Sequence, residues 1–533
     1  MSPSVSLSNK QAHPASHHDN RICHDHELET SVVCKIKGFT AREQLAATTM
    51  AQSVEEADLD KEKQLDEVEV SRNNEFTPTF EYSAAEERAL LRKQDLTILP
   101  LCAAIYFLCY LDRSNIGNAR ILNSTTHNDM QFETHSTQYQ FNIALMVFLV
   151  AYAIFEVPSN ILLKKLRPSR WIAFLMFSWG AITMGLGGVQ NFSSLAAVRF
   201  ILGASEAGLF PGLVYYLTFW YKSDERSVRV ASILASATLA GAFGGAIAYG
   251  IGHMNGASGL SAWRWLFIIE GAPSCVSSLF VLFVLPDYPE EHFKGREREI
   301  ALARLKVEGS KRHHRSMTWE DAKTTLTDWR LYGHYLIYFG VSVPFSSLSL
   351  FTPSITSGLG YKDLQAQLMS VPPYAVAYVT QILVSWSADH FNARGIHSAV
   401  FALIGAVGFI ALVSLPVDAF QHRYGCLILA SAGSFACIPP MLGWLSSNVY
   451  STASVGLAIA INVSFGGGIG QIPGVWIYPK EEASRGYPTG HWTNAGMLLM
   501  VSAGAAGLRV WYGYKNRKLL REANGQEVRL FRL

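Results

Sequence analysis

The chain of 533 residues is 49% hydrophobic and 16% charged, with a formal net charge of +2. A chain this apolar is not an ordinary soluble protein, and a charge so near neutral gives no indication of nucleic acid, so we expect no nucleic-acid partner. Residues 1–95 are polar, whereas the remainder is mostly apolar segments about 20 residues long, which match the thickness of a bilayer's hydrocarbon core. The composition therefore predicts a polytopic protein embedded in the lipid bilayer.

The predicted elements begin with a cytoplasmic tail, residues 1–95, which has too little apolar material to offset the entropy of ordering and is expected to be disordered. It contains no apolar core of a signal peptide, so the first spanning helix would direct insertion. Twelve spanning helices are predicted, six before and six after a long polar connection. They are expected at residues 97–117, 139–163, 170–189, 193–221, 228–252, 264–286, 332–353, 369–388, 397–416, 424–446, 453–477 and 490–512.

The predicted fold class is all-α, with the twelve transmembrane helices in two six-helix bundles. Lys and Arg gather in alternate connections, for example Arg88, Arg92 and Lys93 before the first helix. Because such connections stay on the cytoplasmic side, both termini are expected there. The remaining domain boundaries are an N-terminal bundle at 96–286, a cytoplasmic loop at 287–331, a C-terminal bundle at 332–512 and a cytoplasmic tail at 513–533.

Among the charged side chains inside otherwise apolar predicted helices, four stand out: Asp112, Arg113, Arg199 and Glu206. Each would cost roughly 2.5–3.5 kcal/mol at the centre of a spanning helix, so each must face protein or water. Arg199 and Glu206 are seven residues apart, which places them on one helix face about 10 Å apart along the axis. Opposite charges at similar depth in the first and fourth helices predict a shared cavity. A static set of ion pairs that fixes helix packing is the alternative.

Other polar residues in the predicted helices are less specific. Glu156 lies near the cytoplasmic end of the second helix, where a role in a gate competes evenly with simple solvation. Tyr374 and Gln381 in the eighth helix are candidates to line the cavity. Glu270 in the sixth helix is expected to be structural and to pair with a neighbouring helix.

Neither metal nor catalytic chemistry is indicated. The 7 cysteines lack disulfide or zinc spacing, and no constellation of nucleophile, acid and base is found, so we expect no metal, no cofactor and no enzymatic activity. The glycine-rich residues 465–474 in the eleventh helix are not a phosphate-binding loop, because no strand precedes them. They predict a bent or closely packed helix.

A series of motifs occurs in order over about residues 90 to 515. They include residues 91–100 (LRKQDLTILP), 110–119 (YLDRSNIGNA), 155–160 (FEVPSN), 206–212 (EAGLFPG), 476–479 (WIYP) and 487–491 (YPTGH). Together they resemble the anion:cation symporter branch of the major facilitator superfamily, and more closely its fungal allantoate permease group. The resemblance implies two six-helix halves around a central site that opens alternately to each side.

The resemblance also implies roles for individual residues. In related bacterial sugar-acid and animal organic-anion carriers, an Asp-Arg pair in the first helix and an Arg and a Glu seven residues apart in the fourth serve proton coupling and anion binding. Asp112, Arg113, Arg199 and Glu206 match those positions. One departure follows the eighth helix, where the family's Ser-Asp-Arg is replaced by residues 387–390 (SADH), so the gate pairing of Asp389 is left open. A second is residues 448–454, which lack the basic residue common there.

The expected function is secondary transport of a small organic anion with protons by alternating access, by a monomer in the plasma membrane. Arg113, Arg199, Asn115, Tyr374 and Gln381 are expected to bind the substrate. Asp112 and Glu206 would carry protons, and Glu156 and Asp389 would serve as gates. The alternatives are a nutrient sensor of the same fold that does not transport, and an uncoupled facilitator or exchanger. The resembling group handles ureides, vitamins, dipeptides and sugar acids, so it does not select one anion.

Overall fold

The computed structural model describes residues 82–307, 319–361, 363–449, 452–522 and 530–533. The chain divides into two units, Met1–Thr79 and Phe80–Leu533, and the described residues all belong to the second. Most of the predicted tail therefore lies outside the described residues. Its last part is helical, because α2 begins at Ala84 and not at the predicted residue 97. Ser83 and Glu86 form a capping box that starts this helix: each accepts a hydrogen bond from the other's backbone N–H.

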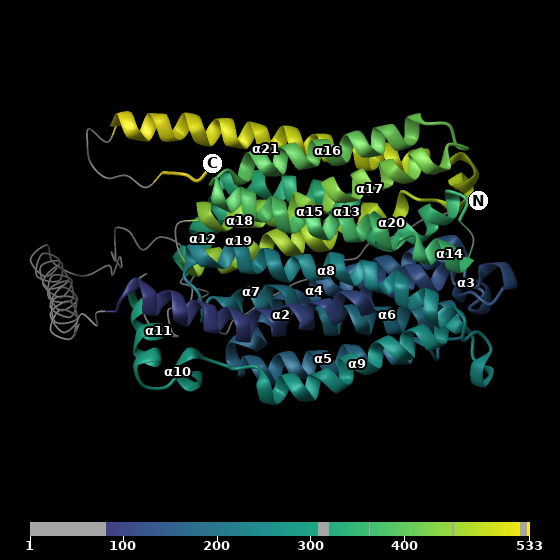
Figure 1. Cartoon of the computed structure of the whole chain (residues 1–533), viewed down its shortest axis with the longest axis horizontal. Helices are drawn as coiled ribbons and strands as arrows, with labels where there is room; N and C mark the ends of the chain where they lie inside the picture. The colour runs from purple at the N-terminus through teal and green to yellow at the C-terminus, as the bar shows by residue number, and fades with distance from the viewer. Residues whose placement is uncertain (1–81, 308–318, 362, 450–451, 523–529) are drawn as a thin grey trace, which may run out of the picture. The chain divides into compact units, whose positions relative to one another are not determined.

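The N-terminal half is built from helices that pack side by side (Figure 1, purple to teal). In chain order these are α2 (Ala84–Ile121), α4 (Gln138–Lys165), α5 (Pro168–Leu186), α6 (Phe192–Glu206), α7 (Leu209–Leu217), α8 (Ser223–Gly252) and α9 (Ala262–Val284). Short segments η1 (Ser124–Thr126), α3 (Met130–Glu133) and η2 (Ala257–Gly259) join them. Helix α5 packs along α9, α4 along α6, and α2 along both α8 and α9.

The C-terminal half follows the same plan (Figure 1, green to yellow). It contains α13 (Trp329–Gly358), α14 (Asp363–Leu368), α15 (Val371–His390), α16 (Arg394–Ser414), α17 (Phe420–Ala436), α18 (Ile438–Asn448), α19 (Thr452–Asn462), η3 (Val463–Gly468), η4 (Ile469–Gln471), α20 (Ile472–Trp476), η5 (Lys480–Arg485) and α21 (Pro488–Glu522). Helix α16 packs against α17 and α21, and α15 packs against α17. The described residues form helices and no strand, so the predicted all-α class is confirmed.

Ten described helical segments are long and apolar enough to cross a membrane, compared with the twelve predicted. The other two predicted segments are helical but do not qualify. One is α5, whose mean hydropathy is lowered by Ser169 and Arg170 in its first turn. The other is the glycine-rich stretch, which is divided into α19, the π-helix η3, η4 and α20. Glycine is a weak helix former, so a run of four within six residues explains why regular α-helix is not maintained there.

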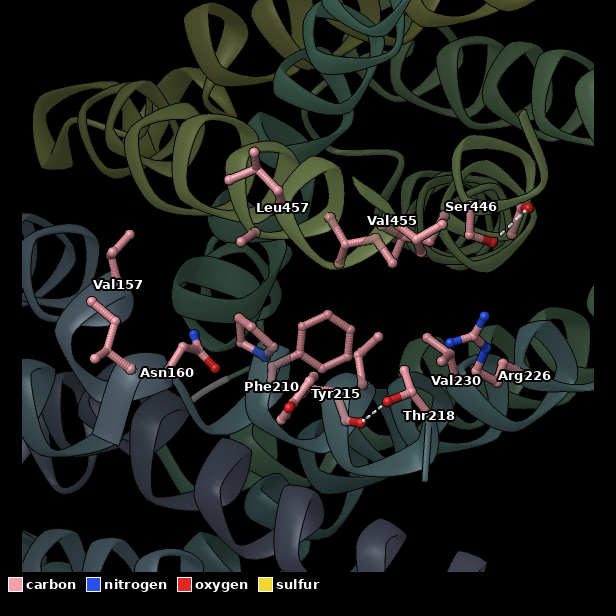
Figure 2. A pocket seen from close by; sticks show the side chains of 17 residues that line it. Val157, Asn160, Phe210, Tyr215, Thr218, Arg226, Val230, Ser446, Val455 and Leu457 are labelled. Atoms are coloured by element: carbon pink, nitrogen blue, oxygen red, sulfur yellow. Dashed lines mark hydrogen bonds between the residues drawn. The ribbon is translucent and has the colours of Figure 1, made fainter. Parts of the chain in front are cut away.

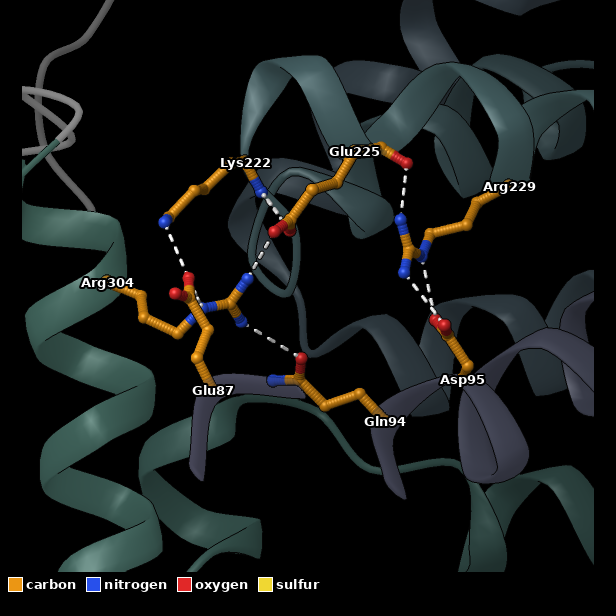
Figure 3. A network of polar contacts seen from close by, with 7 residues as sticks. All are labelled: Glu87, Gln94, Asp95, Lys222, Glu225, Arg229 and Arg304. Atoms are coloured by element: carbon orange, nitrogen blue, oxygen red, sulfur yellow. Dashed lines mark hydrogen bonds and ion pairs between the residues drawn. The ribbon is translucent and has the colours of Figure 1, made fainter. Parts of the chain in front are cut away.

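The predicted cytoplasmic loop, 287–331, contains α10 (Pro289–His292), α11 (Gly295–Val307) and α12 (Trp319–Thr327). Arg304 of α11 is buried and pairs with Glu87 of α2, at 2.8 Å, and with Glu225 of α8 (Figure 3). Lys222 also pairs with Glu87, at 2.7 Å. Burial lowers the pKa of Lys222, but the hydrogen bond and charge of Glu87 outweigh it and raise this pKa overall. The connection is thus fastened to the N-terminal half by buried ion pairs.

The two ends of the helical bundle differ in how the halves meet. We call the end at which α2 begins and α21 ends the inner end, since the charge pattern predicts it to be cytoplasmic, and the opposite one the outer end. Towards the outer end α2 packs on α13, and α8 packs on α14 and α15. A Cβ atom on Gly117 of α2 would collide with the backbone of Leu350, and one on Gly241 of α8 would collide with the ring of Tyr374. The halves are therefore in close contact there.

Candidate functional site

A cavity of about 40 Å³ lies between the two halves. The N-terminal half contributes Tyr106, Arg113, Tyr152, Phe210 and Leu234, and the C-terminal half contributes Tyr338, Val341, Ser342, Phe345, Ile438, Val463, Gly467 and Gln471. Of the described residues that line it, only Arg113 is charged. A single water needs roughly 10–15 Å³ on this measure, so the cavity has room for a few waters but not for an organic anion. It is nearly closed in this arrangement.

Arg113 is held at the cavity wall by a buried carboxylate. Its Nε donates to Oε2 of Glu206 at 2.8 Å, and the Glu206 side chain is fully buried. The guanidinium carbon lies 4.6 Å from the ring centroid of Tyr152 and 5.3 Å from that of Phe148. Oε1 of Glu206 has no hydrogen-bond partner among the described residues. The carboxylate is thus satisfied chiefly through the arginine, and the arginine retains an edge towards the cavity.

A break in the predicted fourth helix places Glu206. Helix α6 ends at Glu206, and α7 begins at Leu209 after Gly208 adopts a φ of +81°. Only glycine takes this conformation at no steric cost. A Cβ atom at Gly208 would also lie 2.5 Å from the side chain of Ser159 on α4. The glycine therefore allows both the turn and the close approach of α4, and it leaves Glu206 at a helix end beside Arg113.

Arg199, the other predicted substrate-binding arginine, is buried and is not among the residues that line the cavity. Its guanidinium carbon lies 4.5 Å from the ring centroid of Phe148. The Nε and Nη1 atoms have no hydrogen-bond partner among the described residues. Phe148 thus contacts the guanidinium groups of both Arg113 and Arg199, but only Arg113 reaches the cavity.

Asp112 points to a different neighbour from Arg113. It is fully buried, and its Oδ2 accepts a hydrogen bond of 2.6 Å from Ser274 of α9. One turn before Ser274, Glu270 is 2% exposed and interacts electrostatically with Asp112. Neither carboxylate oxygen of Glu270 has a hydrogen-bond partner among the described residues, so the expected pairing of Glu270 with a neighbouring helix is not found. What lies beside Glu270 is another acid.

Asn115, Tyr374 and Gln381 do not line the cavity, and Tyr374 and Gln381 lie where the C-terminal half meets α8. The buried Asn115 accepts a hydrogen bond from Asn118, at 3.3 Å. Tyr374 donates to the backbone carbonyl of Leu348 at 2.9 Å. Gln381 accepts from Thr238 of α8 at 2.7 Å, which links the two halves directly. In this arrangement Tyr374 and Gln381 join helices, whereas Asn115 bonds within α2.

The two predicted gating residues differ in what they connect. Glu156 of α4 is fully buried and accepts a hydrogen bond of 2.8 Å from Ser464 in the π-helix η3, so it joins the two halves. Asp389 pairs with Arg394 at 2.5 Å, at the junction of α15 and α16, within the C-terminal half. Arg394 also donates to the carbonyl of Gly443 at 3.0 Å. The cation missing next to Asp389 in the sequence motif is thus supplied by Arg394.

A larger pocket of about 260 Å³ lies on the inner side of the cavity, and we call it the vestibule (Figure 2). Residues of α4, α7 and α8 line one wall, and residues of α18 and α19 line the other. Phe210 lines both the cavity and the vestibule. The arrangement therefore holds a pocket towards the inner end, beside the contacts of α8 with α18 and of α7 with α19, and is closed by packing towards the outer end.

Sequence reasoning did not find the aromatic lining of the cavity. Tyr106, Tyr152, Phe210 and Tyr338 are aromatic residues in apolar helices, where they look like ordinary core. Spacing offers a partial signal, because Tyr106 precedes Arg113 by seven residues and so shares its helix face. Sequence reasoning also did not predict that Arg120 is buried. It is buried at the outer end, where it donates to Gln138 at 2.6 Å.

Comparisons with known proteins give consistent matches. The family model described as "Major Facilitator Superfamily" matches residues 102–475. A protein named "MFS transporter prlL", from Fungal sp. (strain NRRL 50135), is 67% identical over 471 residues, which cover 88% of this chain and 95% of that one. A protein named "Putative tartrate transporter", from Agrobacterium vitis, is 31% identical over 423 residues, covering 78% and 94%.

Solved structures match at lower identity. The xylose transporter XylE from E. coli, in a partially occluded inward-open conformation, superposes with a TM-score of 0.58 at 14% identity, covering 77% of this chain and 97% of that one. A bacterial homologue of the human lysosomal transporter Spinster superposes with a TM-score of 0.57 at 16% identity, covering 78% and 96%. These likenesses concern the fold.

Proposed function

Because this chain belongs to the Major Facilitator Superfamily and is thus a membrane transporter, we propose that it is a proton-coupled symporter of a small organic anion. We place it in the anion:cation symporter branch, in its allantoate permease group. The supporting observation is Arg113, the charged group of the central cavity, held by a buried acid. A guanidinium group is planar and stays charged, so it binds an oxyanion with two parallel hydrogen bonds.

The pairing of Arg113 with Glu206 supplies the coupling. An anion that binds Arg113 competes with Glu206 for the same cation. The carboxylate would then be buried without its partner, which is costly as long as it is ionised. Uptake of a proton by Glu206 removes that cost, so anion and proton bind together. Asp112, beside Glu270 and without a cation of its own, is proposed as a second proton carrier.

Alternating access follows from the unequal ends of the bundle. In this arrangement the outer contacts at Gly117 and Gly241 are closed, and the vestibule lies on the inner side of the cavity, with Phe210 in the wall of both. Separation of the outer contacts and closure of the vestibule would expose Arg113 to the other side. We propose that the Glu156–Ser464 hydrogen bond must break and re-form during this change, which is the gating role of Glu156.

The test is uptake into proteoliposomes containing the full chain, with labelled organic anions screened at acid and neutral external pH. For an anion that accumulates under a proton gradient, Glu206→Gln is expected to abolish accumulation and to retain exchange of labelled for unlabelled anion. Gradient-driven accumulation that survives in Glu206→Gln would refute the coupling. Uptake that ignores the proton gradient would indicate a facilitator or exchanger, and binding without uptake would indicate a sensor.

A further inference from the structure

The central cavity presents one cation to a ligand. Arg113 is the only charged residue among the described residues of its lining. Arg199 is 1% exposed and packs on Phe148 outside that lining. One edge of the Arg113 guanidinium is already used by Glu206. A ligand in this cavity therefore meets a site for a single anionic group.

The other walls of the cavity are mostly apolar, so they favour apolar groups of a ligand over its hydroxyl groups. Apart from Arg113, its polar side chains are Ser342, Gln471 and the hydroxyls of the tyrosines. Ser342 already donates to the carbonyl of Tyr338 at 2.8 Å. The remainder is ring and aliphatic surface, from Tyr106, Tyr152, Phe210, Leu234, Tyr338, Val341, Phe345, Ile438 and Val463. A polyhydroxylated or doubly charged ligand would leave polar groups unpaired against these walls, which costs free energy.

The vestibule continues this apolar surface inward from Phe210. Figure 2 shows Val455 and Leu457 of one half facing Phe210 and Val230 of the other across the pocket. Its volume of about 260 Å³ is several times that of the cavity. Arg226 also lines the vestibule. It precedes Leu234 by eight residues on α8, so it lies roughly 12 Å along the axis from the cavity. A short dianion cannot reach both arginines.

We infer, building on the function proposed above, that the substrate is an amphipathic monoanion: one carboxylate or similar acid group on an aromatic or aliphatic body. The acid group binds Arg113, and the body lies against Phe210 and extends into the vestibule. Small dianions of the tartrate type are poor ligands of this site, because their second charge would be buried without a cation.

A chain-length series tests this inference. The probes are the monocarboxylates from butyrate to octanoate, the dicarboxylates from succinate to suberate, and the amides of the same monocarboxylates. Binding to the purified full chain is measured by thermal stabilisation. Each added methylene is expected to tighten monocarboxylate binding by up to about fourfold, since that is the contribution of one buried CH₂. The shortest dicarboxylates, succinate and glutarate, are expected to bind at least tenfold more weakly than the monocarboxylates of the same length.

Variants separate the site from general partitioning. Phe210→Ala is expected to weaken the dependence of binding affinity on chain length. If loss of the ring impairs folding, the isosteric variant Val230→Thr is used instead, and the same result is expected. The matched control is Phe177→Ala, at an exposed position of α5 outside both pockets, and it should behave as the parent. A dependence on chain length that persists in both vestibule variants would overturn the inference.

Other outcomes distinguish failure of this inference from failure of the proposed function. Succinate and glutarate that bind as well as the monocarboxylates of the same length, or affinities that do not change with length, would overturn the inference. In that case, loss of carboxylate binding in Arg113→Gln would still support anion recognition at Arg113, and so the proposed function. Amides that bind as tightly as the acids, or binding that is indifferent to Arg113→Gln, would overturn the proposed function as well.

Discussion

The spanning helices of the N-terminal half bury acids and bases, whereas those of the C-terminal half bury mainly hydroxyl and amide groups. The first set includes Asp112, Arg120, Glu156, Arg199, Glu206 and Glu270. Among the described residues of the C-terminal half no Asp or Glu is buried, and the buried Arg423 donates to the backbone carbonyls of Leu412 and Gly486. Although the two halves have similar architecture, the N-terminal half contains most of the buried charged side chains, and the C-terminal half contributes mainly uncharged surfaces and contacts.

The largest effect is expected from Arg113→Gln, which removes the charged group of the cavity. Transport should be lost because the anion has no cation to bind, and the free energy of unfolding should fall by about 3–5 kcal/mol because a buried ion pair loses one partner. The double variant Arg113→Gln with Glu206→Gln replaces the pair by neutral groups. It should recover thermal stability without recovering transport. Arg296→Gln, which removes an exposed ion pair with Glu86, serves as the control. Substantial transport by Arg113→Gln would contradict the assignment of charge-dependent binding to the N-terminal half.

A smaller effect is expected from Ser464→Ala, which removes the partner of Glu156 on the C-terminal half. Leaving a buried acceptor unpaired costs about 1–3 kcal/mol, so this arrangement should be populated at least severalfold less. The measurement is the reactivity of a cysteine introduced at Val455 in the vestibule towards a water-soluble thiol reagent. Ser398→Ala is the matched control, because the Ser398 hydroxyl donates to the backbone carbonyl of Arg394 in its own helix. Equal reactivity in the two variants would exclude a gating role for this contact.

The smallest effect on transport is expected from His491→Gln in the C-terminal half. His491 is buried and bonds to Tyr478, which in turn accepts from Asn494. Loss of one such bond should lower the free energy of unfolding by about 1 kcal/mol, measured as a fall in Tm. The pH dependence of uptake should not change. A shifted pH profile would show that the C-terminal half takes part in proton coupling, and the division between halves would then be wrong.

Sequence patterns predicted the helices well because each must supply about 20 apolar residues to cross the bilayer. They also identified the buried charges, since such residues stand out in apolar surroundings. They did not predict which charge faces which neighbour. Asp112 and Arg113 are consecutive, so their side chains point about 100° apart around α2, and only one could face the cavity. Nor did spacing show that Gly208 ends α6 just after Glu206, because a glycine in a spanning helix more often reflects close packing.

The ion pair of Arg113 and Glu206 has a consequence for energetics across a polarised membrane. Without substrate the two side chains carry opposite charges that cancel. With a monoanion on Arg113 and a proton on Glu206, the sum is again zero. This pair therefore contributes no net charge to the reorienting protein in either direction, and any dependence of transport on voltage would report the proton proposed for Asp112.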